Sequence, residues 1–122
     1  MRKTAKLILA ASSGALLLAS MSLTPVQVMA GESMVEQGKS IAEDRKKGNC
    51  FTCHYYEGAH LAGNIAPPFF GMKDRFPDKA ALRAQIWDST AKNPNTMMPP
   101  FGRHEILTEE EIDAITEWVY AL

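Results

Sequence analysis

The sequence has little cysteine and no excess of charge of either sign. Two cysteines among 122 residues allow one disulfide at most, so a small scaffold held together by several disulfides is excluded. The formal net charge is −1, and no run of like charge is long enough to form a tail that binds nucleic acid. With 46% hydrophobic and 22% charged residues the chain is expected to fold, and its length favours one domain.

Alternating β-strand patterns, internal repeats and low-complexity tracts are also absent from the sequence. Helical patterns predict helices at residues 34–47, 79–89 and 109–122. Asp78 is a good N-cap for the second helix, and Thr108 with Glu111 forms a capping box for the third. The chain is therefore predicted to be all-α with long irregular loops. The side chains expected on the buried helix faces are Val35, Gly38, Ile41, Ala42, Leu82, Ile86, Trp87, Ile112, Ile115, Trp118, Val119 and Leu122.

Residues 1–30 have the pattern of a signal peptide: a basic start, an uncharged and mostly apolar stretch, and small residues before a cleavage site after Ala30. A retained membrane anchor is the alternative, but serines interrupt the apolar stretch and Pro25 follows it. Cleavage would leave residues 31–122 as one domain, with ten basic against fourteen acidic residues. We therefore expect a periplasmic protein with no stable membrane anchor after cleavage.

A domain of this size often needs a disulfide, a metal or a cofactor to be stable. Residues 50–54 read Cys-Phe-Thr-Cys-His, the attachment signature of c-type haem. Thiols three residues apart on a helical turn can each add to one vinyl group of the porphyrin. The histidine that follows can then supply an imidazole nitrogen to the iron. We predict one haem c attached at Cys50 and Cys53, with His54 as an axial ligand.

Three other uses of these residues are chemically conceivable. A disulfide between Cys50 and Cys53 would close a very short loop and contribute little stability. A thioredoxin-like redox pair needs a βαβ pattern, which the sequence does not show. A zinc site could form from both cysteines and two of the three histidines, but it would leave the export signal and the methionine-containing loop at residues 93–101 unexplained.

A second axial ligand has several candidates: Met34, Met72, Met97, Met98, His60 and His104. Met98 is preferred because it lies in a loop bounded by prolines, which can hold a thioether with little backbone freedom. Met97 is the alternative in the same loop, whereas a packing role is expected for Met72. His60 and His104 lie in polar loops, where a solvated side chain is expected, and ligation by either is a minor alternative.

With this motif early, a methionine–proline loop late and a helix at each end, the chain resembles the class I cytochromes c. The resemblance implies that the terminal helices cross, with a glycine of the first helix meeting an aromatic residue of the last; the matching positions are Gly38 and Trp118. It also implies that a proline after the haem motif directs its carbonyl group at the proximal histidine. Pro67 is the matching residue, four positions before Gly71.

Within that class, the stretches at residues 63–73, 82–88 and 93–104 resemble the SoxX family, the monohaem subunit of SoxAX sulfur-oxidation cytochromes. The resemblance implies a periplasmic complex with a SoxA-type cytochrome. That complex joins thiosulfate oxidatively to a carrier-protein cysteine, an L-cysteine S-thiosulfotransferase reaction, and the electrons pass to a downstream cytochrome. Its catalytic haem is ligated by a cysteine, and Cys50 and Cys53 are both used for attachment, so no substrate-converting residue is expected on this chain.

The alternative function is a freely diffusing class I cytochrome c that serves respiration. A haem edge rimmed by exposed apolar residues, with Phe69, Phe70 and Phe101 as candidates, would favour a lasting interface instead.

Overall fold

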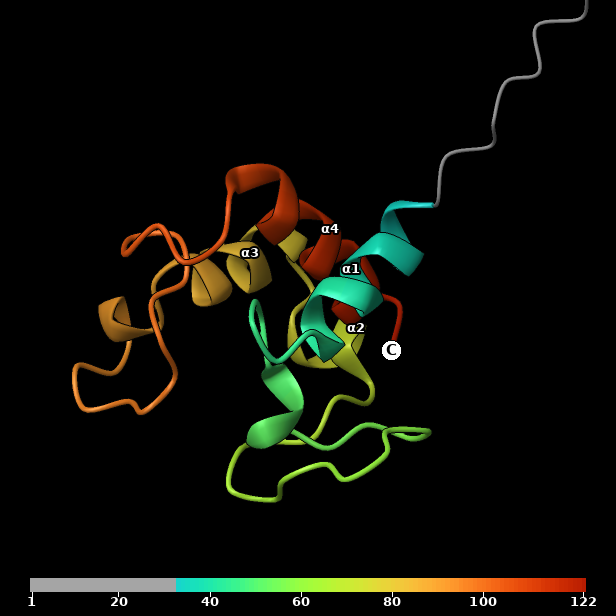
Figure 1. Ribbon diagram of the computed structural model, residues 1–122. Helices are drawn as coiled ribbons and strands as arrows, with labels where there is room; N and C mark the ends of the chain where they lie inside the picture. Colours follow the sequence, from blue (N-terminus) through green and yellow to red (C-terminus); the bar gives the residue numbers. More distant parts are fainter. Residues whose placement is uncertain (1–32) are drawn as a thin grey trace, which may run out of the picture.

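The computed structural model describes residues 33–122, and this part of the chain is helical with no β-strand, as the sequence predicts. The predicted signal peptide and the domain boundary at residue 31 lie outside the described residues. The four α-helices and two 3₁₀ turns are α1 (Met34–Glu43), η1 (Cys50–Thr52), α2 (Met72–Arg75), α3 (Lys79–Trp87), η2 (Ser89–Ala91) and α4 (Glu109–Tyr120) (Figure 1).

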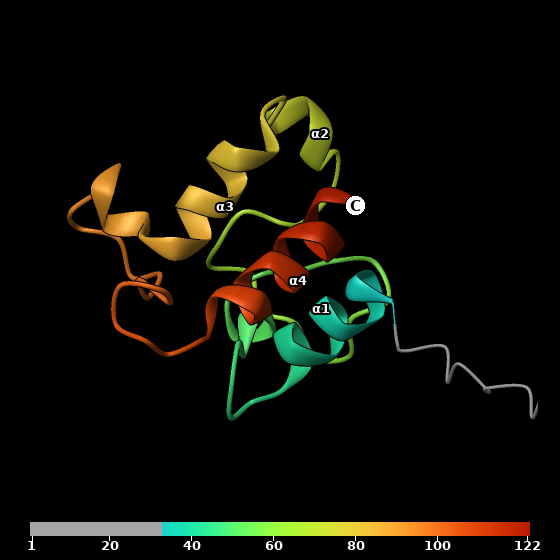
Figure 2. The same cartoon turned by 90° about the horizontal axis from the view of Figure 1, so that it is seen from above.

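The first and last helices, α1 and α4, pack side by side and form the most extensive contact between elements (Figure 2). A glycine makes this close approach possible. A Cβ atom added at Gly38 would lie 1.9 Å from the carbonyl oxygen of Ala114, and the next closest atoms belong to the same stretch of α4 backbone. The glycine therefore meets the α4 backbone one turn before Trp118, and that backbone lies closer to it than the tryptophan ring.

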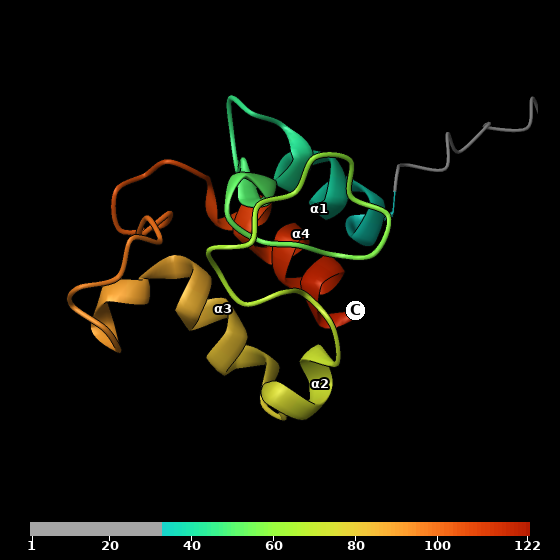
Figure 3. The ribbon, with the colours of Figure 1, turned by 90° about the horizontal axis from the view of Figure 1, so that it is seen from below.

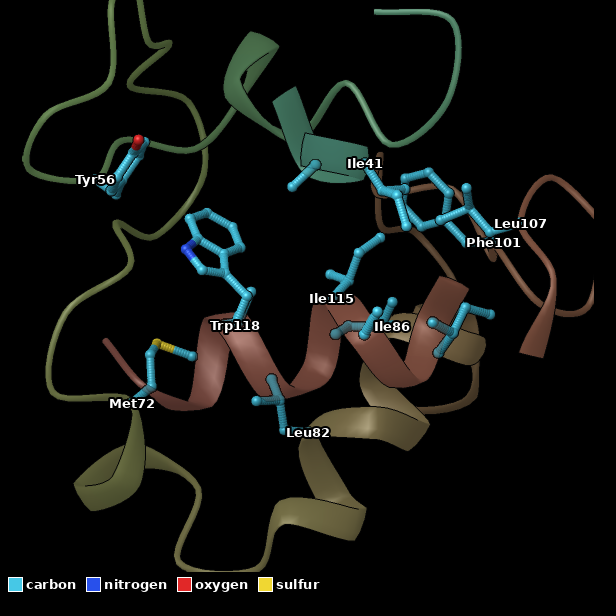
Figure 4. Packing of buried hydrophobic residues seen from close by; sticks show 13 residues of the cluster. Ile41, Tyr56, Met72, Leu82, Ile86, Phe101, Leu107, Ile115 and Trp118 are labelled. Atoms are coloured by element: carbon cyan, nitrogen blue, oxygen red, sulfur yellow. The ribbon is translucent and has the colours of Figure 1, made fainter. Parts of the chain in front are cut away.

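The tryptophan instead packs among other rings. Trp118 is 4% exposed and points from α4 towards Tyr56 in Figure 4. Its ring stands edge-on to three aromatic rings, at centroid distances of 5.7 Å for Phe51, 5.3 Å for Tyr56 and 5.9 Å for Phe69. Such edge-to-face pairs add about 0.5–1.5 kcal/mol each beyond area burial. The last helix is thus joined through Trp118 to the segment that contains the cysteines.

Helix α3 packs against the other side of α4 through Leu82 and is linked to it by charged side chains at the surface. Lys79 contacts Glu117 at 2.6 Å, and the Arg83 guanidinium contacts Asp113 at 2.5 Å and a second α4 carboxylate at 3.2 Å. Exposed pairs of this kind contribute little individually, so the buried face of α3 carries the packing.

The first predicted helix ends earlier than the sequence pattern indicates, at Glu43 and not at Lys47. Asp44 causes the difference. Its backbone is extended, its carbonyl oxygen accepts hydrogen bonds from Lys47 and Asn49, and its carboxylate accepts one from the Lys46 amide. A local Asp turn of this kind competes with helix continuation.

The other predicted boundaries are close to those observed. Asp78 caps α3, whose α-helical part ends at Trp87, and Thr108 and Glu111 form the predicted capping box of α4. The short helix α2 lies within a segment that was expected to be loop. Of the residues expected on buried faces, Val35 is 39% exposed, so its predicted burial was wrong.

Candidate functional site

Two loop regions extend from the helical core, and together they carry all the predicted ligands. One runs from η1 through residue 71 and the other from residue 88 to residue 107 (Figure 3). The cysteines, His54 and Pro67 belong to the first region and Met98 to the second.

The cysteine motif lies on a single tight turn. Asn49 precedes it in the left-handed conformation (φ 47°), and its side-chain oxygen accepts a hydrogen bond from the Thr52 hydroxyl at 2.7 Å. The amides of Cys53 and His54 both donate to the carbonyl oxygen of Cys50, at 3.2 and 2.9 Å. The turn brings the two sulfurs and the imidazole within one short segment, as haem attachment requires.

Cys50 lies in an apolar environment against the core cluster. Burial raises the pKa of its thiol to about 12, and the nearby Cys53 adds to the effect. Cys50 therefore lies at the edge of the core, on the turn that carries the attachment motif.

The His54 imidazole is fixed on two sides. Its Nδ1–H donates to the carbonyl oxygen of Pro67 at 2.7 Å, the contact that the family resemblance implies, and this leaves Nε2 as the nitrogen with a free lone pair. The Phe69 ring stacks on the imidazole, with centroids 4.4 Å apart and planes 18° apart. Burial lowers the pKa of His54, although the Pro67 carbonyl opposes this, so the neutral form that a metal needs is favoured.

The segment that carries Pro67 is itself hydrogen-bonded to the motif. The Gly63 amide donates to Phe51 at 2.7 Å, and the Ala66 amide donates to Cys53 at 3.0 Å. A Cβ atom at Gly63 would lie 2.1 Å from the carbonyl oxygen of Thr52, so only glycine allows this close approach. The backbone around Pro67 is therefore held in register with His54.

Arg75 is a neighbour of His54 that the sequence analysis missed. Its guanidinium donates to the carbonyl oxygen of Pro68 at 2.7 Å and lies 3.3 Å from the sulfur of Met72. Its charge also contributes to the lowered pKa of His54. Met72 is 2% exposed in the core, which confirms the packing role expected for it.

In the second loop region, the two adjacent methionines differ in how exposed their side chains are. Met97 is 81% exposed, whereas Met98 is half-buried and packs against the core cluster. The loop is attached to the end of α3, because the Gly102 and Arg103 amides both donate to the carbonyl oxygen of Trp87. This arrangement favours Met98 over Met97 as an iron ligand, and the choice remains a prediction.

The other predicted candidates have simpler roles. His60 and His104 are exposed, as expected for solvated loop histidines. Within residues 33–122 no group of three or more histidine, cysteine or acidic side chains could hold a metal ion. Phe101 is 7% exposed and belongs to the core, so it is not available for an exposed apolar rim, whereas Phe70 is 65% exposed.

The residues of the site fit a covalent haem in their chemistry. They offer two sulfurs on one turn, a neutral imidazole with Nε2 available, and a half-buried thioether on a second loop. The assignment of Cys50, Cys53, His54 and Met98 to haem remains a prediction, and these contacts support it.

Comparisons with known proteins agree with this chemistry. Residues 33–119 match the family described as "Cytochrome C oxidase, cbb3-type, subunit III". A protein of Aquifex aeolicus (strain VF5), named "Uncharacterized lipoprotein", is 34% identical over 76 residues, or 62% of this chain. The match spans 37% of that relative's length. Among the described residues, no helix is both long and apolar enough to cross a membrane.

Proposed function

This chain belongs to the family described as cytochrome C oxidase, cbb3-type, subunit III, and from that premise we propose a specific electron-transfer role. Family membership makes the chain a class I c-type cytochrome that binds haem c covalently and transfers electrons. The specific role is that of a SoxX-like subunit: it accepts electrons from a SoxA-type cytochrome and passes them to a downstream cytochrome.

The hydrogen bond between His54 and Pro67 is the observation that carries the electron-transfer function. It fixes the imidazole before the iron is bound, so little reorganisation is needed when the iron changes its charge. When bound, haem supplies a one-electron couple between ferric and ferrous iron. The chain's own residues would hold it: the cysteines would attach it, His54 and Met98 would ligate the iron, and Phe69 keeps the imidazole plane in place.

The SoxX-like role rests on the motif resemblance and on cysteine content. The 122 residues contain two cysteines, and both lie in the attachment motif, so none is left to ligate a catalytic haem or to bind thiosulfate sulfur. Joining thiosulfate to a thiol releases a proton and two electrons. A chain with one haem would accept these electrons one at a time. The substrate chemistry is therefore proposed to occur on the partner.

The alternative is a freely diffusing class I cytochrome c that serves respiration, and the family match is equally compatible with it. The two proposals differ in how long the partner stays bound. Exposed apolar side chains on the loop before α2, namely Leu61, Ile65 and Phe70, would favour a lasting interface.

We propose the periplasm as the location. The cytochrome domain and the lipoprotein relative indicate an exported protein. A lipoprotein carries its lipid on a cysteine, and both cysteines of these 122 residues are assigned to haem. Residues 1–30 are therefore proposed to act as a cleaved signal peptide.

Mild native purification followed by a haem-stained denaturing gel tests these proposals. The protein is purified through a tag at its C-terminus. The tag should follow a flexible linker, because the carbonyl oxygen of Leu122 accepts a hydrogen bond from the Gly71 amide at 2.9 Å. Two stained bands, one from a larger cytochrome, would support the SoxX-like role. A single stained band would favour the diffusing carrier, and an unstained chain would contradict haem attachment.

The same gel also tests where the partner binds, with a variant that carries Phe70→Ser and Leu61→Ser. Both side chains are exposed, so folding and staining of this chain should persist. A lasting apolar interface would be weakened, and the larger band should become fainter. An unchanged larger band would place the partner elsewhere on the surface.

A further inference from the structure

A buried hydroxyl lies where α3 meets the loop that carries Met98. Ser89 is 0% exposed, and its hydroxyl donates to the carbonyl oxygen of Met98 at 2.7 Å. The carbonyl oxygen of Ser89 accepts from the Asn93 amide at 3.2 Å, which closes the turn at the start of the loop. Serine is usually exposed, so its complete burial requires hydrogen bonds of this kind.

The other backbone group of Met98 is also held by a hydroxyl. The Met98 amide donates to the Thr96 side chain at 3.2 Å. Pro99 follows Met98 and restricts its backbone to extended conformations. Both polar backbone groups of Met98 are therefore engaged in hydrogen bonds with hydroxyl groups.

We propose that Ser89 is a positioning residue that holds Met98 in place for the iron, with Thr96 as its weaker counterpart. This inference rests on the proposed function, because it takes Met98 as the axial ligand. The Ser89 bond acts on the backbone of Met98, so it biases the loop towards the arrangement in which the sulfur can reach the iron. Groups that orient a ligand in this way change metal affinity about 10- to 100-fold when removed.

Competition with imidazole measures this effect on the full, haem-loaded protein. Imidazole binds ferric iron when Met98 leaves it, so its apparent affinity rises with the population of the detached state. Loss of the weak sulfur-to-iron absorption band reports the exchange. In Ser89→Ala the apparent imidazole affinity is expected to rise about tenfold, and the reduction potential is expected to fall.

Thr116→Val is the matched control. Thr116 is 3% exposed, and its hydroxyl also donates to a backbone carbonyl, that of Ile112, at 2.7 Å. The substitution removes a buried hydrogen bond of the same kind within α4, outside the methionine loop. It should lower global stability and leave the imidazole affinity and the reduction potential unchanged.

Two further variants keep the proposal testable if Ser89→Ala does not accumulate. Thr96→Val changes a half-buried loop residue and should raise the imidazole affinity in the same direction by a smaller factor. Ser89→Thr keeps the hydroxyl, and although its added methyl group is expected to lower stability at this fully buried position, the imidazole affinity should stay close to that of the parent protein. An unchanged affinity in Thr96→Val would then count against positioning by these hydroxyls.

The outcomes separate this inference from the proposed function. If Met98→Ala retains the sulfur-to-iron band, Met98 is not the ligand and the proposed site itself is wrong. If Met98→Ala loses the band but Ser89→Ala matches Thr116→Val in imidazole affinity and reduction potential, the ligand stands and the positioning role of Ser89 is overturned.

Discussion

The two sides of the candidate haem site are built in different ways. On the His54 side, the ligand is fixed by a backbone carbonyl and a stacked ring, and that ring packs on Trp118 of α4. On the Met98 side, two hydroxyls hold the backbone of a loop that is mostly exposed. Both sides pack against the core cluster, but the first is held by stacked rings and the second by hydrogen bonds from hydroxyl groups to the backbone. Ligand exchange is therefore expected on the methionine side, with His54 staying bound.

The largest expected effect is the loss of covalent haem, and it tests whether haem attachment depends on the His54 side alone. A chain with Cys50→Ala and Cys53→Ala should lose all haem that survives denaturation, because no thioether can form. Met98→Ala is the matched change on the other side, and it should keep its stained haem. Acid–acetone extraction followed by haem staining measures both. Covalent haem on the double variant would contradict the assignment of the cysteines.

A large loss of stability is expected for Gly38→Ala, which disrupts the packing of α1 against α4 next to the His54 side. The added Cβ would lie 1.9 Å from the Ala114 carbonyl oxygen, and neither backbone can move without separating α1 from α4. We expect a loss of about 3 kcal/mol or more in the free energy of unfolding, measured with urea. Gln37→Ala, an exposed change on the same helix, should stay within about 0.5 kcal/mol.

A smaller loss is expected for the corresponding change on the methionine side, Gly102→Ala. Here the added Cβ would lie 2.2 Å from the ring of Trp87, a half-buried side chain that can move away. We expect a loss of about 1–2 kcal/mol in unfolding free energy. Trp87→Leu combined with Gly102→Ala should cost less than the sum of the two single changes. Strict additivity would show that the ring and the glycine do not collide.

The sequence predicts the His54 side better than the methionine side, for a physical reason. The cysteines and His54 are close in the chain, and one turn suffices to bring them together. The caps at Asp78 and Thr108 are equally local. Pro67 was identified by family resemblance, because a contact across 13 residues has no local signal.

What the sequence could not predict depends on tertiary contacts. A serine nine residues from a methionine looks like any polar loop residue until the loop folds back and buries it. Arg75 appears as one charge in a charged run, and its position near His54 depends on where α2 packs. Asp44 ended α1 early because its carboxylate competed locally with a helical pattern that continued in the sequence.

The smallest expected effect concerns a surface ion pair. It tests whether surface charge also stabilises the His54 side against unfolding. Lys47, just before the cysteine motif, pairs with Glu111 at the start of α4. The hydrogen bond from the Lys47 ammonium, aided by the Thr108 amide, holds the pKa of Glu111 below its ordinary value of 4.5. Because the pKa is lower in the folded protein, this stabilisation is fully present above pH 4.5 and is lost as the pH falls through the folded value.

Glu111→Gln should therefore be slightly less stable than the parent at pH 7, and the difference should shrink as the pH falls below 4.5. Urea unfolding at a series of pH values measures it. Glu110→Gln is the control, since it removes an exposed carboxylate from the same helical turn without breaking this pair. A difference that persists unchanged at low pH would show that it does not come from the charge of Glu111, because protonation removes that charge in the parent as well. The pair would then add nothing to the strength of the His54 side, which would rest on its buried rings and backbone contacts.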